Sequence, residues 1–111
     1  MKNFDNFIDG RFVPSTGMDR IEVKNPSTGS LICTIPDGTN DDVQAAIAAA
    51  ETAQKTWEKE PAANRAKLLK ALAAKIRQNV EPIARVITEE QGKTLGLARV
   101  EVDFKIGRAH V

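Results

Sequence analysis

Short apolar segments separated by turn signals fill the first third of the chain. In residues 7–13 the apolar positions flank an Asp-Gly pair at 9–10, a dipeptide whose tolerance of positive φ suits tight hairpin turns. In residues 21–35 they flank Asn25–Gly29, which is composed entirely of residues typical of turns. The alternation predicts two β-hairpins.

From residue 37 onward the apolar positions follow helical spacing. Asn40, Asp41 and Asp42 open the first predicted helix with a capping side chain and with acids where the helix dipole favours them. The stripe of this helix ends at Trp57, which we interpret as a core anchor. The stripe comprises Val43, Ala46, Ile47, Ala50, Gln54 and Trp57.

Three more helices are predicted before residue 106. Pro61 suits the first turn of the second helix, because a missing N–H costs nothing there. Pro82 is expected to start the third helix and Gly92 to end it in a left-handed conformation, and a fourth helix begins near Thr94. In chain order, their apolar stripes are Leu68, Leu69, Leu72, Ile76 and Val80; Ile83, Val86 and Ile87, which are expected to face inward; and Leu97, Val100 and Phe104.

Much of the apolar content of the chain is alanine. Hydrophobic residues make up 41% of the sequence, but aromatic residues make up 5%, and alanines crowd residues 45–53. Alanine favours helix but removes little apolar surface from water, and isolated hairpins are marginally stable. We therefore expect the strands to lie against a further sheet or another subunit, and the helices to lie against other protein surface.

Charge and the pattern of the first residues argue against several classes of protein. Lys and Arg number 16 against 15 Asp and Glu, so the chain has no broad basic field for nucleic acid. Residues 1–8 contain no continuous apolar run, which argues against a signal peptide or a membrane anchor. The lone Cys33 cannot form an intramolecular disulfide, in agreement with a reducing compartment. We expect a cytoplasmic protein with no membrane or nucleic-acid partner.

Few residues in the chain are suited to chemistry. Cys33 lies in an apolar strand where burial hinders ionisation, so we interpret it as structural; a small enzyme using this thiol is the least favoured alternative. Residues 92–94, Gly-Lys-Thr, imitate the end of a phosphate-binding loop, but Ile87 stands where that motif requires glycine. No Gly-x-Gly-x-x-Gly motif follows a strand. We identify no catalytic and no cofactor-binding residue.

Several short segments follow one another at a consistent spacing, although none of them is specific alone. In chain order they are residues 7–13, 23–29, Ile35 and Pro36, 41–43, 45–53, Trp57, Arg65, Leu68 and Leu69, 90–93, and Glu101 and Val102. Together they resemble the N-terminus of NAD(P)-dependent aldehyde dehydrogenases over residues 4–104. Residues 35–38 and 97–104 are most similar to the lactaldehyde and glycolaldehyde branch of that family.

The resemblance implies the α/β fold of aldehyde dehydrogenases, here only its N-terminal part, with two β-hairpins followed by about four α-helices. Residues 1–36 would belong to an oligomerisation element, and residues 37–105 would pack on the cofactor-binding domain. The whole enzyme would oxidise an aldehyde to a carboxylic acid with NAD or NADP through a cysteine thioester, as a homodimer or homotetramer. This segment alone would bind no cofactor and would be inactive. The alternative is a non-catalytic binding or assembly module.

The resemblance also implies a site for a monovalent cation. Some members of the family hold a structural cation with a main-chain carbonyl just before the Asn-Pro turn and with an acid further along the chain. The matching positions in this sequence are Val23, Lys24 and Asp103.

The last six residues, 106–111, depart from the family pattern. Gly107 falls where the family continues a helix, and the six residues can be encoded by ATC GGA AGA GCA CAC GTC, the start of a common short-read sequencing adapter. We expect this tail to be translated adapter read-through, with Lys105 at the junction. The lone histidine, His110, lies in it and is given no role.

Overall fold

A computed structural model of the chain describes residues 2–108, and it describes side chains from Asn3 to Phe104. The chain divides into two compact units. The strand unit comprises the described parts of Met1–Lys24 and Ser30–Lys59, and the helical unit comprises Asn25–Gly29 together with the described residues from Glu60 onward.

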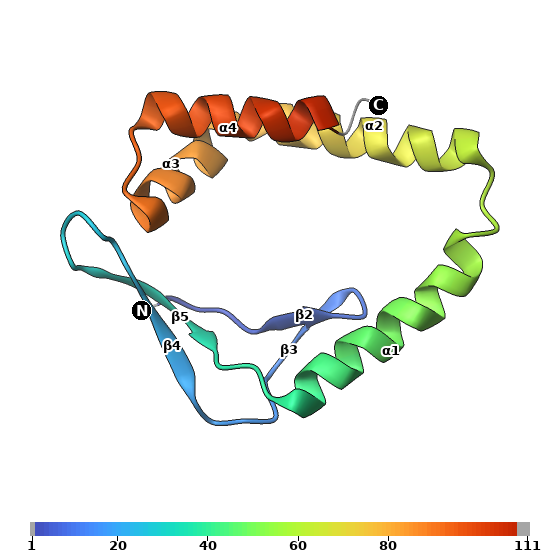
Figure 1. Ribbon diagram of the computed structural model, residues 1–111, viewed down its shortest axis with the longest axis horizontal. Helices are drawn as coiled ribbons and strands as arrows, with labels where there is room; N and C mark the ends of the chain where they lie inside the picture. Colours follow the sequence, from blue (N-terminus) through green and yellow to red (C-terminus); the bar gives the residue numbers. More distant parts are fainter. Residues whose placement is uncertain (1, 109–111) are drawn as a thin grey trace. The chain divides into compact units, whose positions relative to one another are not determined.

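The strand unit contains both predicted hairpins and one strand that was not predicted (Figure 1). In the three-stranded sheet, β5 lies between β4, to which it is antiparallel, and β1, to which it is parallel. The second sheet is the antiparallel pair of β2 and β3. The strands are β1 (Lys2–Asn3), β2 (Asn6–Ile8), β3 (Arg11–Val13), β4 (Arg20–Lys24) and β5 (Leu31–Pro36).

The turn between β2 and β3 has the predicted conformation. Asp9 has φ 53° and Gly10 has φ 73°, so both central residues are left-handed, as a two-residue hairpin turn with the twist of its strands requires. The turn sets Phe7 opposite Phe12, and their rings meet edge to face with centroids 5.1 Å apart. The first hairpin prediction is confirmed.

Helix α1 (Asn40–Trp57) is capped at its N-terminus by the residue just before it. The capping residue is Thr39, not one of the three residues predicted to open the helix, and Thr39 and Asp42 form a reciprocal capping box. The prediction for Trp57 was wrong, because this side chain is 42% exposed. Among the described elements α1 packs mainly against β2, which leaves the last turn of the helix uncovered.

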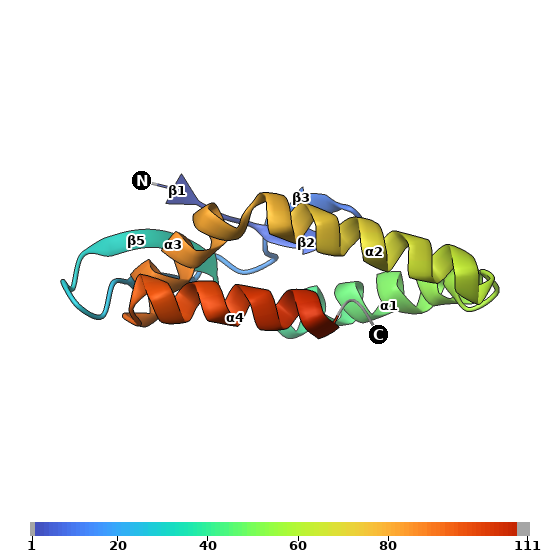
Figure 2. The same cartoon turned by 90° about the horizontal axis from the view of Figure 1, so that it is seen from above.

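The helical unit contains α2 (Ala62–Gln78), α3 (Val80–Gln91) and α4 (Leu95–Arg108). Helix α4 packs against both α2 and α3 (Figure 2). The fully buried residues are Ala73, Ala84, Ala98 and Val102, and their partly buried neighbours are Ile76, Val80, Ile83, Ile87 and Leu95. Small side chains at these positions let the helices approach closely, so the helical unit has a thin core.

The buried faces of the helices are only partly those that the large apolar residues predicted. Leu68, Leu69 and Leu72 are exposed, and Val86, expected to face inward, is 51% exposed. On α4 the packed positions are Leu95, Ala98 and Val102, whereas the predicted stripe is exposed. These helices carry apolar residues on more than one face, and small residues occupy the packed one. Periodicity favours the larger side chains, so it identified the apolar faces that are exposed in this chain and not the faces that pack within the helical unit.

The helix boundaries largely follow the sequence signals. Helix α3 begins at Val80, two residues before Pro82, which lies in its first turn where a missing N–H costs nothing. Gly92 ends α3 with φ 72°, as predicted. Helix α4 continues through Gly107 to Arg108, into the segment predicted to be a non-native tail. The rest of that segment, including His110, lies outside the described residues.

Candidate functional site

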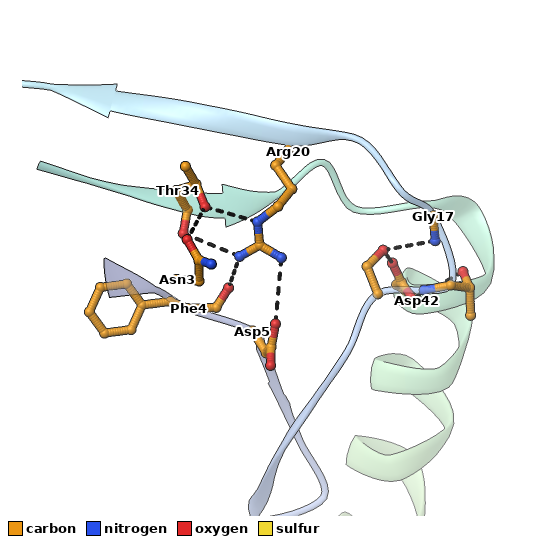
Figure 3. A network of polar contacts seen from close by, with 9 residues as sticks. Asn3, Phe4, Asp5, Gly17, Arg20, Thr34 and Asp42 are labelled. Carbon is orange, nitrogen blue, oxygen red and sulfur yellow. Dashed lines mark hydrogen bonds and ion pairs between the residues drawn. The ribbon is translucent and has the colours of Figure 1, made fainter. Parts of the chain in front are cut away.

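A buried carboxylate is the most highly coordinated polar group in the strand unit. The carboxylate of Asp42, 7% exposed, accepts hydrogen bonds from the hydroxyl of Ser15, from the Thr16 amide at 2.9 Å and hydroxyl at 3.1 Å, and from the Thr39 amide at 3.0 Å. The Asp42 amide in turn donates to the Thr39 hydroxyl at 3.2 Å. The loop before β4 is thereby joined to the first turn of α1 (Figure 3).

These bonds decide the protonation state of Asp42. Donation by the Ser15 hydroxyl, and then by the Thr16 and Thr39 amides, holds the pKa of Asp42 well below its usual range. A carboxylate so fully occupied by donors is a poor general base, because its lone pairs are already committed. The cluster therefore serves structure. The Thr-x-x-Asp spacing was a signal for the capping box, but no local signal pointed to Ser15 or Thr16.

A second polar cluster ties together the three strands of the larger sheet. The Arg20 guanidinium on β4 donates to the Thr34 hydroxyl at 2.9 Å and to the Phe4 carbonyl at 2.5 Å, and it lies 3.6 Å from the Asp5 carboxylate (Figure 3). The Thr34 hydroxyl donates to the Asn3 side chain at 2.9 Å. This network positions the short strand β1 beside β5. No local sequence signal pointed to this role of Arg20.

The helical unit carries two ion pairs that involve residues of α4. Arg99 on α4 makes a bidentate contact with Glu81 on α3, at 2.5 and 3.0 Å, and its hydrogen bonds lower the pKa of Glu81. The ammonium of Lys93, in the loop between α3 and α4, donates to the carboxylate of Glu101 on α4. Lys93, which stands in the Gly-Lys-Thr segment that imitates a phosphate-binding loop, is thus engaged by an acid of its own chain.

The residues of the predicted cation site belong to different units. Val23 and Lys24 lie on β4 in the strand unit, whereas Asp103 is an exposed residue of α4 in the helical unit. Lys24 forms an ion pair with Glu22 at 2.8 Å, and this hydrogen bond raises the pKa of Lys24. Among the described residues there is no cluster of three or more His, Cys, Asp or Glu that could hold a metal ion. The cation site stays a prediction.

Cys33 is 3% exposed and unpaired, which agrees with the structural role predicted for it. It sits on β5 opposite Val23 of β4. No acid or base side chain is recorded in a hydrogen bond to it within the part of the chain that the structure describes. A nucleophilic thiol needs a neighbouring base or a positive environment. The arrangement does not support chemistry at this sulfur.

Two cavities among the described residues lack the form of a dinucleotide site. One, a groove of about 500 Å³ at the corner of α2 and α3, is lined by apolar side chains with Lys75 and Asn79 as its polar members. A second hollow, of about 320 Å³, lies between the first hairpin and the alanines of α1. Neither joins a glycine-rich turn to a helix N-terminus, the arrangement that binds a pyrophosphate.

Within residues 2–108, no helix is long and apolar enough to cross a membrane.

Comparison with known proteins gives this geometry its context. Residues 12–110 match the aldehyde dehydrogenase family, and the chain belongs to that family. Its strands and helices form the N-terminal part of the aldehyde dehydrogenase fold.

The relatives are much longer than this chain. Lactaldehyde dehydrogenase from Escherichia coli is 47% identical over 98 residues, which are 88% of this chain and 20% of that protein. Its crystal structure matches with a TM-score of 0.90, over 95% of this chain and 22% of the other. A structure of 3,6-anhydro-L-galactose dehydrogenase in complex with NAP matches at 31% identity, with a TM-score of 0.92. The match covers 96% of this chain and 22% of that chain. A structure of betaine aldehyde dehydrogenase from Staphylococcus aureus, in complex with NAD+, matches at 32% identity with a TM-score of 0.90. The match covers 96% of this chain and 22% of that chain. The chain spans about a fifth of each relative.

Proposed function

We propose that this chain forms the N-terminal scaffold of an enzyme that oxidises a small aldehyde to a carboxylic acid with NAD or NADP. The observation that carries the proposal is the match of residues 12–110 to the aldehyde dehydrogenase family. The thiol of Cys33 is buried, and no acid or base side chain hydrogen-bonds to it among the described residues. In this proposal the reacting groups belong to parts of the fold that these residues do not include.

The surface of the chain supports a role as one part of a larger body. Large apolar side chains are exposed on the described helices, among them Leu68 and Leu72 of α2, at 56% and 53%, and Leu97 of α4, at 60%. Exposed apolar surface of this kind marks a contact with other protein surface. We propose that further parts of the enzyme cover it.

The chemistry proposed for the whole enzyme is thioester catalysis. A cysteine thiolate adds to the aldehyde carbonyl, the nicotinamide supplies a hydride acceptor, and water releases the carboxylic acid. No step of this chemistry is assigned to the described residues. The relatives named above suggest a small polar aldehyde as substrate, and the whole enzyme is proposed to be a homodimer or homotetramer.

Two proteins test this proposal. Purified chain, mixed with lactaldehyde and NAD+ or NADP+, is expected to give no absorbance increase at 340 nm. A chimera that joins residues 1–104 to the remainder of the E. coli lactaldehyde dehydrogenase is expected to oxidise lactaldehyde, while that remainder alone is not. Turnover by the isolated chain would show that it holds its own reacting groups. A soluble chimera that is inactive would show that these residues do not serve as the scaffold.

The alternative, a non-catalytic binding module, has one observation in its favour. The apolar faces left exposed on α2 and α4 could bind to a complete aldehyde dehydrogenase subunit from outside. Adding purified chain to active E. coli lactaldehyde dehydrogenase separates the two proposals. A saturable change in rate supports the module, whereas an unchanged rate supports the scaffold.

A further inference from the structure

The turn between β4 and β5 belongs structurally to the helices. Asn25–Gly29 groups with the helical unit, although the strands that enter and leave it are part of the strand unit. A hairpin turn usually packs with its own strands or faces solvent. The grouping therefore indicates a specific contact between this turn and a helical element.

The turn is stiffened from within before it meets the helices. The Asn25 side-chain oxygen accepts hydrogen bonds from the Ser27 amide at 2.8 Å and from the Thr28 amide at 3.3 Å. The Gly29 amide donates to the Asn25 carbonyl at 2.8 Å, and Gly29 takes the left-handed φ of 71°. An Asn side chain that closes a turn in this way limits the conformations of the residues it encloses. Pro26 and Ser27 are thus presented in a fixed arrangement.

The turn contacts the junction of α3 and α4 at Gly92. Gly92 has φ 72°, and its amide donates to the Thr88 carbonyl at 2.9 Å, which closes the last turn of α3. A Cβ at this position would lie 2.9 Å from Cγ of Pro26 and 3.4 Å from the hydroxyl oxygen of Ser27. The first distance is shorter than carbon atoms tolerate. Two independent demands therefore require glycine here, a left-handed backbone and the close approach of Pro26.

We propose that the Asn25–Gly29 turn is a strap seated on the α3–α4 junction, with Gly92 as the positioning residue that lets it close. The junction has three residues, 92–94, and the Lys93–Glu101 pair joins it to α4. The strap restrains it from the side of Pro26. The strap is continuous in sequence with β4 and β5. This role is independent of the reaction proposed for the whole enzyme.

Amide hydrogen exchange on the intact chain tests the strap from a distance. Asn25→Ala removes the acceptor that stiffens the turn and leaves α3 and α4 unaltered in sequence. We expect exchange at the Gly92 and Ala98 amides to rise about tenfold, because the junction loses its restraint. The matched control is Asn64→Ala, since Asn64 bonds to Glu60 in the same unit and lies outside the junction. Faster exchange confined to the turn would overturn the proposal, as would an unprotected Gly92 amide in the parent chain.

A double substitution separates the contact from the backbone conformation. Gly92→Ala is expected to destabilise the junction in two ways, through the left-handed backbone and through the clash with Pro26. In a Pro26→Ala background the clash is absent, and only the backbone cost remains. We expect Gly92→Ala to speed exchange at Ala98 several-fold more in the Pro26 parent than in the Pro26→Ala background. Equal increases in the two backgrounds would mean that Pro26 does not press on Gly92, and the strap would be refuted.

Discussion

In the strand unit the most completely enclosed side chains are Asp42 and Cys33, whereas in the helical unit they are three alanines and Val102. The strand unit is thus organised around a carboxylate that gathers hydrogen-bond donors from the loop before β4. The helical unit is organised around a contact between small apolar surfaces, with ion pairs at its edge. The units belong to one chain of 111 residues, yet the strand unit is stabilised mainly by hydrogen bonds to a carboxylate and the helical unit mainly by apolar packing.

The difference teaches which perturbation each unit should resist. A thin alanine contact has no polar group to titrate, but it has no spare volume and cannot accept a charge. A hydrogen-bonded carboxylate tolerates changes in the volume of its neighbours but depends on its ionisation. The following substitutions are expected to affect one unit and spare the other.

The largest effect is expected from a charge in the helical core. Val102→Asp places a carboxylate at a position that is 1% exposed, and it should cost about 3–5 kcal/mol of stability because nothing there can pair with it. Val100→Asp on the same helix is the matched control, since Val100 is 49% exposed. The control should cost less than about 1 kcal/mol. Far-ultraviolet circular dichroism in urea measures both, and similar losses in the two variants would contradict the core described for α4.

The second effect is loss of the Asp42 cluster in acid. The folded pKa of Asp42 lies below the unfolded value of about 3.9, so the stabilisation is fully present above pH 4 and is lost as the pH falls through the folded pKa. Exchange at the Thr16 and Thr39 amides should therefore accelerate below pH 4 beyond its intrinsic pH dependence. Asp42→Asn should remove this acid-induced step. A step that survives in the variant would assign it to another carboxylate.

A smaller effect is expected from the cap of α1. Thr39→Ala removes the hydroxyl that accepts from the Asp42 amide and should cost about 1 kcal/mol, seen as faster exchange in the first turn of α1. The control is Thr52→Ala in the same helix, where the hydroxyl bonds to the Ala48 carbonyl. Because alanine is the better helix former, that change should be neutral or stabilising. An equal loss in both variants would mean that the cap has no special role.

The smallest effect is expected from the exposed ion pair between α3 and α4. Glu81→Gln leaves Arg99 without its bidentate partner, but both side chains are about half exposed. The local unfolding constant should change less than about fivefold, and the change should vanish in 1 M salt, where the screening length is about 3 Å. The Asp42 cluster should keep its protection in the same salt. A salt-resistant loss at Glu81 would place this pair among the determinants of the helical core.

Local features of both units were predictable from short stretches of sequence. The first hairpin was found because the Asp-Gly pair sets its own turn, and the end of α3 was found because Gly92 favours the left-handed conformation. The polar clusters were less accessible. Asp42 was identified as a favourable acid at a helix start, but its donors Ser15 and Thr16 lie 26–27 residues earlier in the chain. The same holds for Arg20, which bonds to segments on both sides of it.

The sequence by itself determined where the turns and helices of this protein lie and, through the order of its segments, the family to which it belongs. Each of those signals is carried by residues a few positions apart, whose backbone preferences act before any tertiary contact forms. The tertiary structure alone decided that β1 joins β5 in parallel, that α4 buries Ala98 and Val102 instead of Leu97 and Phe104, and that a hairpin turn rests against Gly92. These outcomes depend on shape matching between distant segments, which no local preference encodes.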